Sequence, residues 1–203
     1  MSEKHKTSRR GFLRGAGLTT AGLAVSPLLN AQPAPAADPF TDATATPVTL
    51  RVNGETRKAT IESRATLADV LREDLDLTGT KVVCDRGACS CCTVYLDGEP
   101  VCSCLTLALD VDGREVTTIE GLGTEEDLHP VQQAFIDHDA SMCGFCTPGM
   151  VMSCAHLLEE NPSPTLDEVK TATSGNLCRC GTYPKVFSAT LAAAETQSRR
   201  RRR

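Results

Sequence analysis

The chain contains no tryptophan, and aromatic residues make up only 3% of its 203 residues. At this length we expect one or two small domains, neither of which has a large aromatic core. The sequence also lacks the Gly-x-Gly-x-x-Gly fingerprint of a dinucleotide-binding fold and any obvious set of acid and base groups for a substrate. We therefore expect no catalytic residue in this chain.

Basic residues are scarce outside the two ends of the chain. Residues 1–37 carry a net charge of +4 and Arg199–Arg203 carry +5, whereas residues 38–198 carry −14. An acidic body of this kind argues against nucleic acid as a partner, because binding to phosphates requires a basic face. It is compatible with docking to other proteins.

No apolar run approaches the roughly 20 residues that a transmembrane helix needs. The N-terminal segment instead contains a twin-arginine motif (residues 8–13, Ser-Arg-Arg-Gly-Phe-Leu), a short apolar run and a small-x-small cleavage site at Ala34-Pro35-Ala36. These features predict a signal peptide over 1–37 and a linker over 38–46. The twin-arginine pathway exports folded proteins, so we expect a periplasmic protein whose cofactors travel with it.

Cysteine is the residue in excess, with eleven copies. An odd count leaves one thiol over in a disulfide framework. Cys84, Cys89 and Cys92 have the spacing of the loop that holds a [2Fe–2S] cluster in plant-type ferredoxins, and Cys102 or Cys104 would supply the fourth thiolate. Structural zinc usually takes two well-separated Cys-x2–4-Cys pairs, which fits this spacing poorly. Gly87 suits the loop because it tolerates unusual backbone angles and lets amide groups approach sulfur.

The residues around this loop alternate as in short strands. They predict two hairpins, a helix and a closing strand, which is the order of a β-grasp ferredoxin-like domain over 47–120. The expected elements are strands 48–52 and 56–61 around Asn53-Gly54, a helix from a capping box at Thr66 to about Leu75, strands 93–96 and 99–102 around Asp97-Gly98, a helical turn over 105–109 and a strand over 115–119.

The pattern becomes helical over 125–198, and it predicts a small bundle of four helices followed by a basic tail over 199–203. The first helix is expected to begin at Pro130 and the second at Gly149. The third should follow a capping box at Thr165, and the fourth should span residues 186–194. Two cysteine pairs lie between these helices, and both loops face one end of an antiparallel bundle. The four thiolates that we expect to hold a second [2Fe–2S] cluster are Cys143, Cys146, Cys178 and Cys180. The predicted fold class is α+β.

Three segments give the chain a specific resemblance: Leu128-His-Pro-Val-Gln132, Cys143-Gly-Phe-Cys-Thr-Pro-Gly-Met150 and Ser174-Gly-Asn-Leu-Cys-Arg-Cys180. With the ferredoxin-type loop, they resemble the iron–sulfur subunit of the xanthine dehydrogenase and aldehyde oxidoreductase family of molybdenum hydroxylases. The resemblance spans roughly residues 47–190, and the export signal is similar to that of the periplasmic aldehyde oxidoreductase type.

The resemblance implies that this chain transfers electrons and that the substrate is bound and oxidised by another subunit. A large subunit with a molybdenum–pterin cofactor would oxidise an aldehyde or an N-heterocycle. Electrons would then pass through the bundle cluster and the ferredoxin-like cluster to an FAD subunit or a cytochrome. The resemblance also selects Cys104 as the fourth ligand of the first cluster. The alternative from a different class is a free-standing periplasmic carrier with two clusters.

The sequence departs from the family pattern at the tightest part of the first loop. Ser90 and Cys91 stand where the family usually has Gly and Ala, and Met142 replaces a Gln that is associated with pterin contact. If the Gly position requires a positive φ angle, Ser90 will be strained. We expect Cys102 and Cys154 to be packed thiols, and Cys91 to be a packed or exposed free thiol rather than a fifth ligand.

Overall fold

The computed structural model describes residues 45–201. The predicted signal peptide, its cleavage site, nearly all of the predicted linker and the last two arginines lie outside the described residues. Among residues 45–201, no helix is long and apolar enough to cross a membrane.

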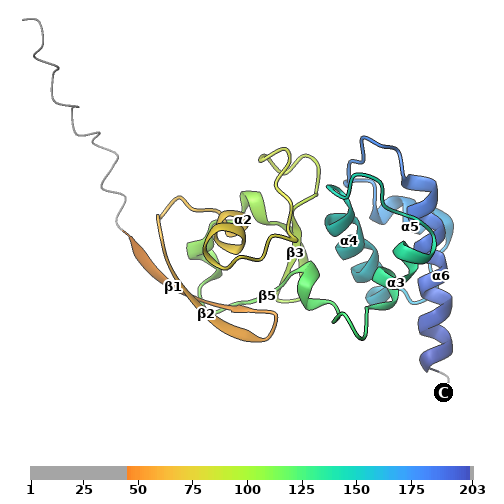
Figure 1. Ribbon diagram of the computed structural model, residues 1–203, viewed down its shortest axis with the longest axis horizontal. Coiled ribbons are helices and arrows are strands. Elements are labelled where there is room, and N and C mark those ends of the chain that lie inside the picture. Colours follow the sequence, from red (N-terminus) through yellow and green to blue (C-terminus); the bar gives the residue numbers. More distant parts are fainter. Residues whose placement is uncertain (1–44, 202–203) are drawn as a thin grey trace, which may run out of the picture. The chain divides into compact units, whose positions relative to one another are not determined.

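The first half is a five-stranded mixed sheet (Figure 1). Its strands lie in the order β2-β1-β5-β3-β4, in which β1 and β5 are parallel and the other neighbours are antiparallel. Both predicted hairpins are confirmed, and Asn53-Gly54 and Asp97-Gly98 have the positive φ angles that such tight turns require. The strands are β1 (Thr46–Val52), β2 (Glu55–Ile61), β3 (Thr93–Leu96), β4 (Glu99–Cys102) and β5 (Glu115–Thr117).

A short helix packs on this sheet. Thr66 accepts a hydrogen bond from the amide of Asp69, and the Asp69 carboxylate accepts one from the amide of Thr66, which confirms the capping box. Only α2 (Leu67–Asp69) is α-helical, because the chain continues as a π-helical turn over Val70–Asp74. Its apolar face is fully buried against the strands, with Leu50, Leu67, Leu71, Val94 and Val116 in one core.

Two of the smaller expectations change in detail. The helical turn expected over 105–109 is two 3₁₀ turns, Ser103–Leu105 and Ala108–Val111. The closing strand is shorter than expected, because a further 3₁₀ turn over Ile119–Gly121 follows Thr117 after one residue. The order of elements is still that of the predicted β-grasp domain.

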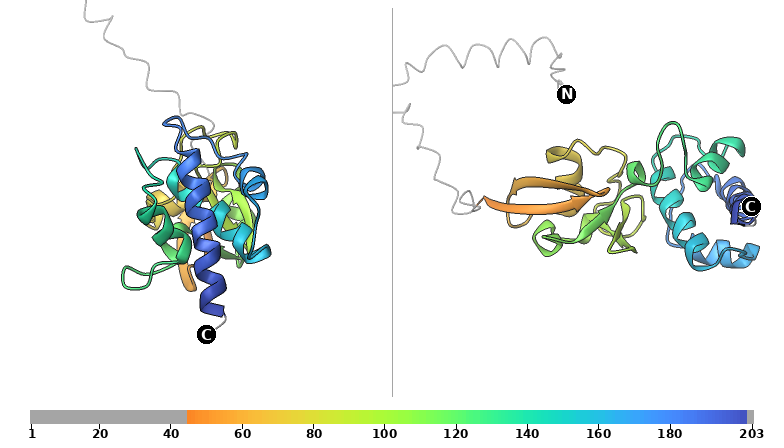
Figure 2. Two further views of the ribbon diagram at one scale, coloured as in Figure 1. Left: turned by 90° about the vertical axis from the view of Figure 1, so that its right-hand side faces the viewer. Right: turned by 90° about the horizontal axis from the view of Figure 1, so that it is seen from below.

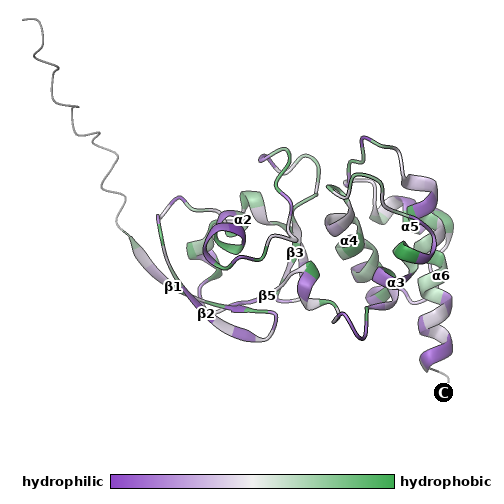
Figure 3. Ribbon diagram, viewed as in Figure 1, coloured by the Kyte–Doolittle hydropathy of each residue, from purple (hydrophilic) through white to green (hydrophobic). Residues whose placement is uncertain are grey.

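The second half contains the four predicted helices, α3 (Pro130–Asp137), α4 (Thr147–Glu160), α5 (Leu166–Ala172) and α6 (Tyr183–Arg201). Thr165 and Glu168 form the predicted capping box of α5. The fourth helix is much longer than the expected 186–194, and Figure 2 shows it as one straight rod. Its first turns bury small residues such as Ala189 and Ala193, which lets α3 approach closely, whereas its last turns are hydrophilic (Figure 3).

Candidate metal centres

The first candidate centre lies in the loop before β3. Three of its predicted ligands, Cys89, Cys92 and Cys104, are less than 7% exposed, and Cys84 is half-buried. Gly87 has a φ of +66° and its amide donates a hydrogen bond to Cys104 Sγ over 3.3 Å. A Cβ at this position would overlap the side chain of Leu105. Both roles expected of Gly87, an unusual backbone angle and an amide directed at sulfur, are therefore confirmed.

The thiols of this centre lie in two pairs. The backbone amide of Arg86 and, next, the Cys89 thiol lower the pKa of Cys84 to about 7. Burial raises the pKa of Cys104 to about 11, the Gly87 amide opposes this, and the neighbouring Cys92 thiol adds to the rise. The thiol of Cys84 therefore lies beside that of Cys89, and the thiol of Cys104 lies beside that of Cys92 and near Cys84 as well.

The second candidate centre lies between the helices of the bundle. Cys146 is the N-cap residue of α4 and is buried, whereas Cys143 and Cys180 are exposed. Cys178 is half-buried; burial raises its pKa, but the Thr182 hydroxyl, whose Oγ1 lies 3.1 Å from Cys178 Sγ, and other donors bring that pKa down to about 7.

The thiols of the second centre also lie in pairs. Burial first, and then the Cys178 thiol, raise the pKa of Cys146 to about 12. The thiol of Cys143 is the main cause of the raised pKa of Cys180. The loops that the sequence placed at one end of the bundle therefore converge, with Cys143 beside Cys180 and Cys146 beside Cys178.

Two pairs of thiols per centre suit a [2Fe–2S] cluster. Four cysteine thiolates would hold such a cluster, which would supply one-electron transfer. Among residues 45–201, no three His, Cys, Asp or Glu side chains gather closely enough to hold a single metal ion. All eleven cysteines lie in this range and none forms a disulfide. Two sets of four free cysteines fit two clusters. Cys84 and Cys178, each with a pKa of about 7, are the most readily available as thiolates, whereas burial raises the pKa of Cys104 and Cys146.

The three remaining cysteines are packed thiols. Cys154 is fully buried in α4 and its sulfur accepts a hydrogen bond from the Thr190 hydroxyl over 3.1 Å. Cys102 is half-buried beside Cys92 and Cys104, and its thiol lies 3.8 Å from the Gly87 carbonyl oxygen. Cys91 is 3% exposed, and its burial raises its pKa to about 12. The sequence could not place Cys91, whose thiol lies near both Cys89 of the first centre and Cys146 of the second.

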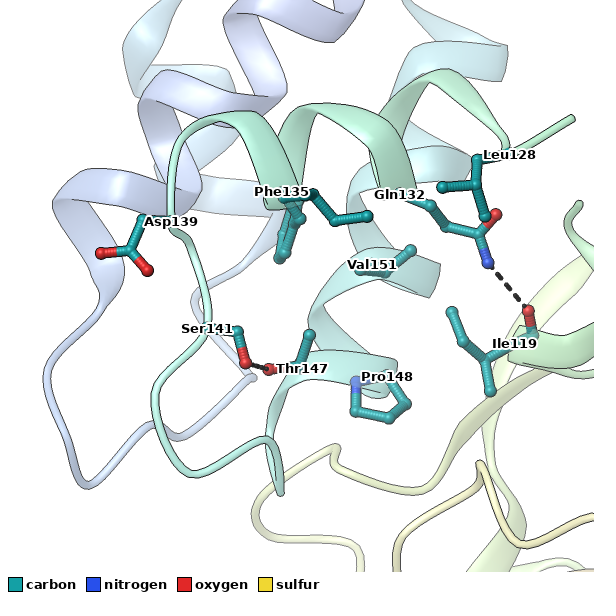
Figure 4. Close-up of a pocket in the computed structure, with 10 residues that line it drawn as sticks. Ile119, Leu128, Gln132, Phe135, Asp139, Ser141, Thr147, Pro148 and Val151 are labelled. Carbon is teal, nitrogen blue, oxygen red and sulfur yellow. Dashed lines mark hydrogen bonds between the residues drawn. The ribbon is translucent and has the colours of Figure 1, made fainter. Parts of the chain in front are cut away.

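An open groove of about 550 Å³ lies beside the second centre (Figure 4). Ser141 and Thr147, whose hydroxyls lie 3.1 Å apart, join the two ends of the loop that carries Cys143 and Cys146 and line one edge of the groove. None of the eight predicted ligands lines it. Its wall is mostly apolar and consists of Ile119, Leu128, Gln132, Phe135, Ile136, Asp139, Ser141, Thr147, Pro148 and Val151.

Both the sheet region and the helical region of the chain match known domain families. Residues 50–118 match the model of the 2Fe-2S iron-sulfur cluster binding domain, and residues 118–191 match that of the [2Fe-2S] binding domain. The iron-sulfur-binding subunit PaoA of aldehyde oxidoreductase from Escherichia coli K12 is 41% identical over 210 residues, which cover 95% of this chain and 91% of the relative.

The names of two further relatives refer to nicotine and quinoline. The nicotine 6-hydroxylase small subunit of Paenarthrobacter nicotinovorans is 50% identical over 146 residues, or 72% of this chain and 88% of the relative. A chain in the crystal structure of quinoline 2-oxidoreductase from Pseudomonas putida 86 superposes with a TM-score of 0.73 at 44% identity. The match covers 76% of this chain and 97% of that one.

Proposed function

Since this chain belongs to the family of iron–sulfur subunits of the molybdenum hydroxylases, we propose that it accepts electrons from a molybdenum–pterin subunit and delivers them to an FAD subunit or a cytochrome. Its own part is electron transfer through two [2Fe–2S] clusters, each of which would take up and release one electron at a time. The observation that carries this function is the presence of two sets of four cysteines in one chain, one in each of the two regions that match [2Fe-2S]-binding domains. The related subunits do not favour the alternative of a free-standing carrier.

The distribution of exposed apolar side chains supports two docking areas. Of the eight large apolar side chains that are exposed among the described residues, five are direct neighbours of a predicted ligand in the sequence. Exposed apolar side chains that gather beside predicted ligands are candidate contacts for a partner protein. The five are Val83 and Leu105 at the first centre, and Met142, Phe145 and Leu177 at the second.

We assign the second centre to the molybdenum subunit. Cys143 and Cys180 reach the surface there, so a donor can approach them without crossing a layer of protein. The apolar groove next to the Cys143 loop extends the same area, and Ile136 at its wall is 64% exposed. For the substrate of the molybdenum subunit we propose an aldehyde or an N-heterocycle, because the related complexes are named for an aldehyde, nicotine and quinoline.

Paired substitutions test this assignment. Phe145→Asp should abolish co-purification of molybdenum with the iron–sulfur chain, because it places a charge in an apolar contact. Leu166→Asp is the matched control, since Leu166 is also exposed but begins α5 away from any cysteine. Leu105→Asp should keep molybdenum and slow only the reduction of the acceptor. Equal retention of molybdenum in Phe145→Asp and Leu166→Asp would contradict the docking area.

Metal analysis separates the two functions. We expect iron and molybdenum to elute together in one complex, whereas a stable monomer with iron and no molybdenum would establish the free-standing carrier. Cys180→Ser should remove the electron paramagnetic resonance signal of one cluster and leave the other. Retention of both signals would contradict the ligand set.

We further propose that the mature protein is periplasmic and is exported folded. The support for this location is the twin-arginine motif over residues 8–13, followed by a short apolar run and a small-x-small cleavage site. Replacement of Arg9 and Arg10 by Lys should retain the protein, with its iron, in the cytoplasm. Unchanged recovery from the periplasm would contradict this route.

A further inference from the structure

Asn176 is a polar side chain at a position where apolar packing would be ordinary. It is 3% exposed and lies two residues before Cys178 of the second centre. Its side-chain amide donates a hydrogen bond over 3.2 Å to the carbonyl oxygen of Ser90, in the loop of the first centre. Residues 86 positions apart are thus joined directly between the two sets of ligands.

A second hydrogen bond runs parallel to the first. The amide of Leu177 donates to the carbonyl oxygen of Cys89 over 3.0 Å. Asn176 and Leu177 therefore attach the loop segment before Cys178 to the loop segment that includes Cys89 and Ser90. We call these two hydrogen bonds the inter-loop bridge.

Both sides of the bridge are held in place. The Tyr183 hydroxyl donates to the Asn176 carbonyl oxygen over 3.0 Å and accepts from the Cys178 amide over 2.8 Å. On the other side, the Thr93 hydroxyl also donates to the Ser90 carbonyl oxygen, over 2.8 Å. Because each partner is fixed by a further hydrogen bond, a change at Asn176 cannot be absorbed by free movement of the loops.

The backbones meet closely at the same place. A Cβ on Gly149, in the first turn of α4, would overlap the Ser90 carbonyl oxygen and touch the Cα of Cys91. Cys146 lies at the start of that helix. The middle of the first ligand loop is thereby in contact with the backbone on both sides of the second centre, near Cys146 and near Cys178.

We propose that Asn176 is a positioning residue that fixes the separation of the two clusters and so sets the rate of electron transfer between them. Its side-chain amide donates to the Ser90 carbonyl oxygen and not to a thiol, so it acts through that carbonyl. Electron tunnelling weakens steeply with distance, so a loop that leaves its partner even part of the time transfers electrons more slowly. The inference rests on the two-cluster function.

The test compares two variants that remove one donor each from the same carbonyl oxygen. Asn176→Asp replaces the inter-loop donor by an acceptor of the same shape. Thr93→Val removes the donor that lies within the first domain and leaves the bridge intact. The intact complex is reduced fully, and the magnetic splitting between the two cluster signals is recorded by electron paramagnetic resonance. Hydrogen exchange of the Leu177 amide is measured in the same samples.

We expect Asn176→Asp to reduce the magnetic splitting and to slow electron transfer between the clusters. Hydrogen exchange of the Leu177 amide should become about fivefold faster, because losing one typical hydrogen bond changes an equilibrium constant by about that factor. Thr93→Val should leave the splitting unchanged. Unchanged splitting and unchanged hydrogen exchange in Asn176→Asp would overturn the inference. The two-cluster function would still stand if the wild type showed the electron paramagnetic resonance signals of two clusters.

A second variant covers the case in which Asn176→Asp does not assemble. Asn176→Ser removes the reach of the amide without adding a charge and should show the same loss of splitting. If both variants lacked a cluster, the inference would be overturned, because Asn176 would then be needed to build a centre rather than to set a distance.

Discussion

Ser90 is the position where a single substitution should stabilise the protein. Its φ of 52° lies in the left-handed region, where an L-residue other than Asn or Asp is rarely found. Adopting this region costs an L-residue about 1–2 kcal/mol relative to the usual conformations. The strain that the sequence predicted for Ser90 is thus confirmed by its backbone angle.

Ser90→Gly should release most of that strain. Glycine reaches the same angle freely but loses about 0.5–1 kcal/mol more conformational entropy on folding. At the midpoints of the two ranges, the net gain is about 0.75 kcal/mol. For a protein of this size, that gain corresponds to a rise in unfolding temperature of about 1–4 °C. The carbonyl of residue 90 remains, so the hydrogen bonds from Thr93 and Asn176 are retained.

Thermal unfolding at a fixed scan rate provides the assay, because loss of a cluster makes unfolding irreversible. Far-ultraviolet circular dichroism reports the fold and visible absorbance reports the clusters. Ser90→Ala is the control, since it removes the hydroxyl but keeps the Cβ that causes the strain. Its unfolding temperature should stay close to that of the wild type, because the hydroxyl makes only a 4.0 Å contact with Cys102 Sγ.

Two results would refute the reasoning. If Ser90→Gly unfolded at or below the wild-type temperature, the left-handed angle would not be a source of strain at this position. If Ser90→Ala were stabilised as much as Ser90→Gly, the effect would come from the hydroxyl and not from the backbone.

Three further substitutions probe other parts of the fold. Thr165→Ala should lower stability by about 1 kcal/mol through loss of the N-cap of α5, as measured by thermal melting, whereas Thr165→Ser should not. Cys154→Ala should keep the full iron content and cost about 1 kcal/mol in stability, and loss of iron would make Cys154 more than a packed thiol. Tyr183→Phe leaves the Cys178 amide without its acceptor and should cost about 1–3 kcal/mol, seen as earlier bleaching of a cluster on heating.

The features that the sequence predicted well are local ones. Asn53-Gly54 specifies a tight hairpin because both residues accept positive φ, and the capping box at Thr165 involves residues only three apart. The cysteine spacing is equally local in each loop. Such patterns reveal an element without any knowledge of what packs against it.

The extent of α6 was missed because the prediction followed apolar residues. After Ala194 the chain is polar, yet the helix continues to Arg201. No Gly or Pro interrupts residues 185–201, and Glu, Gln and Arg are good helix formers, so intrinsic propensity extends the helix beyond its buried part. The π-helical turn over Val70–Asp74 has no comparable local signal.

The contact between the two loops could not be predicted from the sequence, because it joins residues that have no relation in spacing. Asn176 and Ser90 become neighbours only when α4 places Gly149 under the first loop. The same closeness explains why Cys91 is buried, since it packs in one cluster with Cys89 and Cys146. A loop that alone would hold one cluster is thus shaped by contact with the second centre, and its two unusual residues lie where the centres meet.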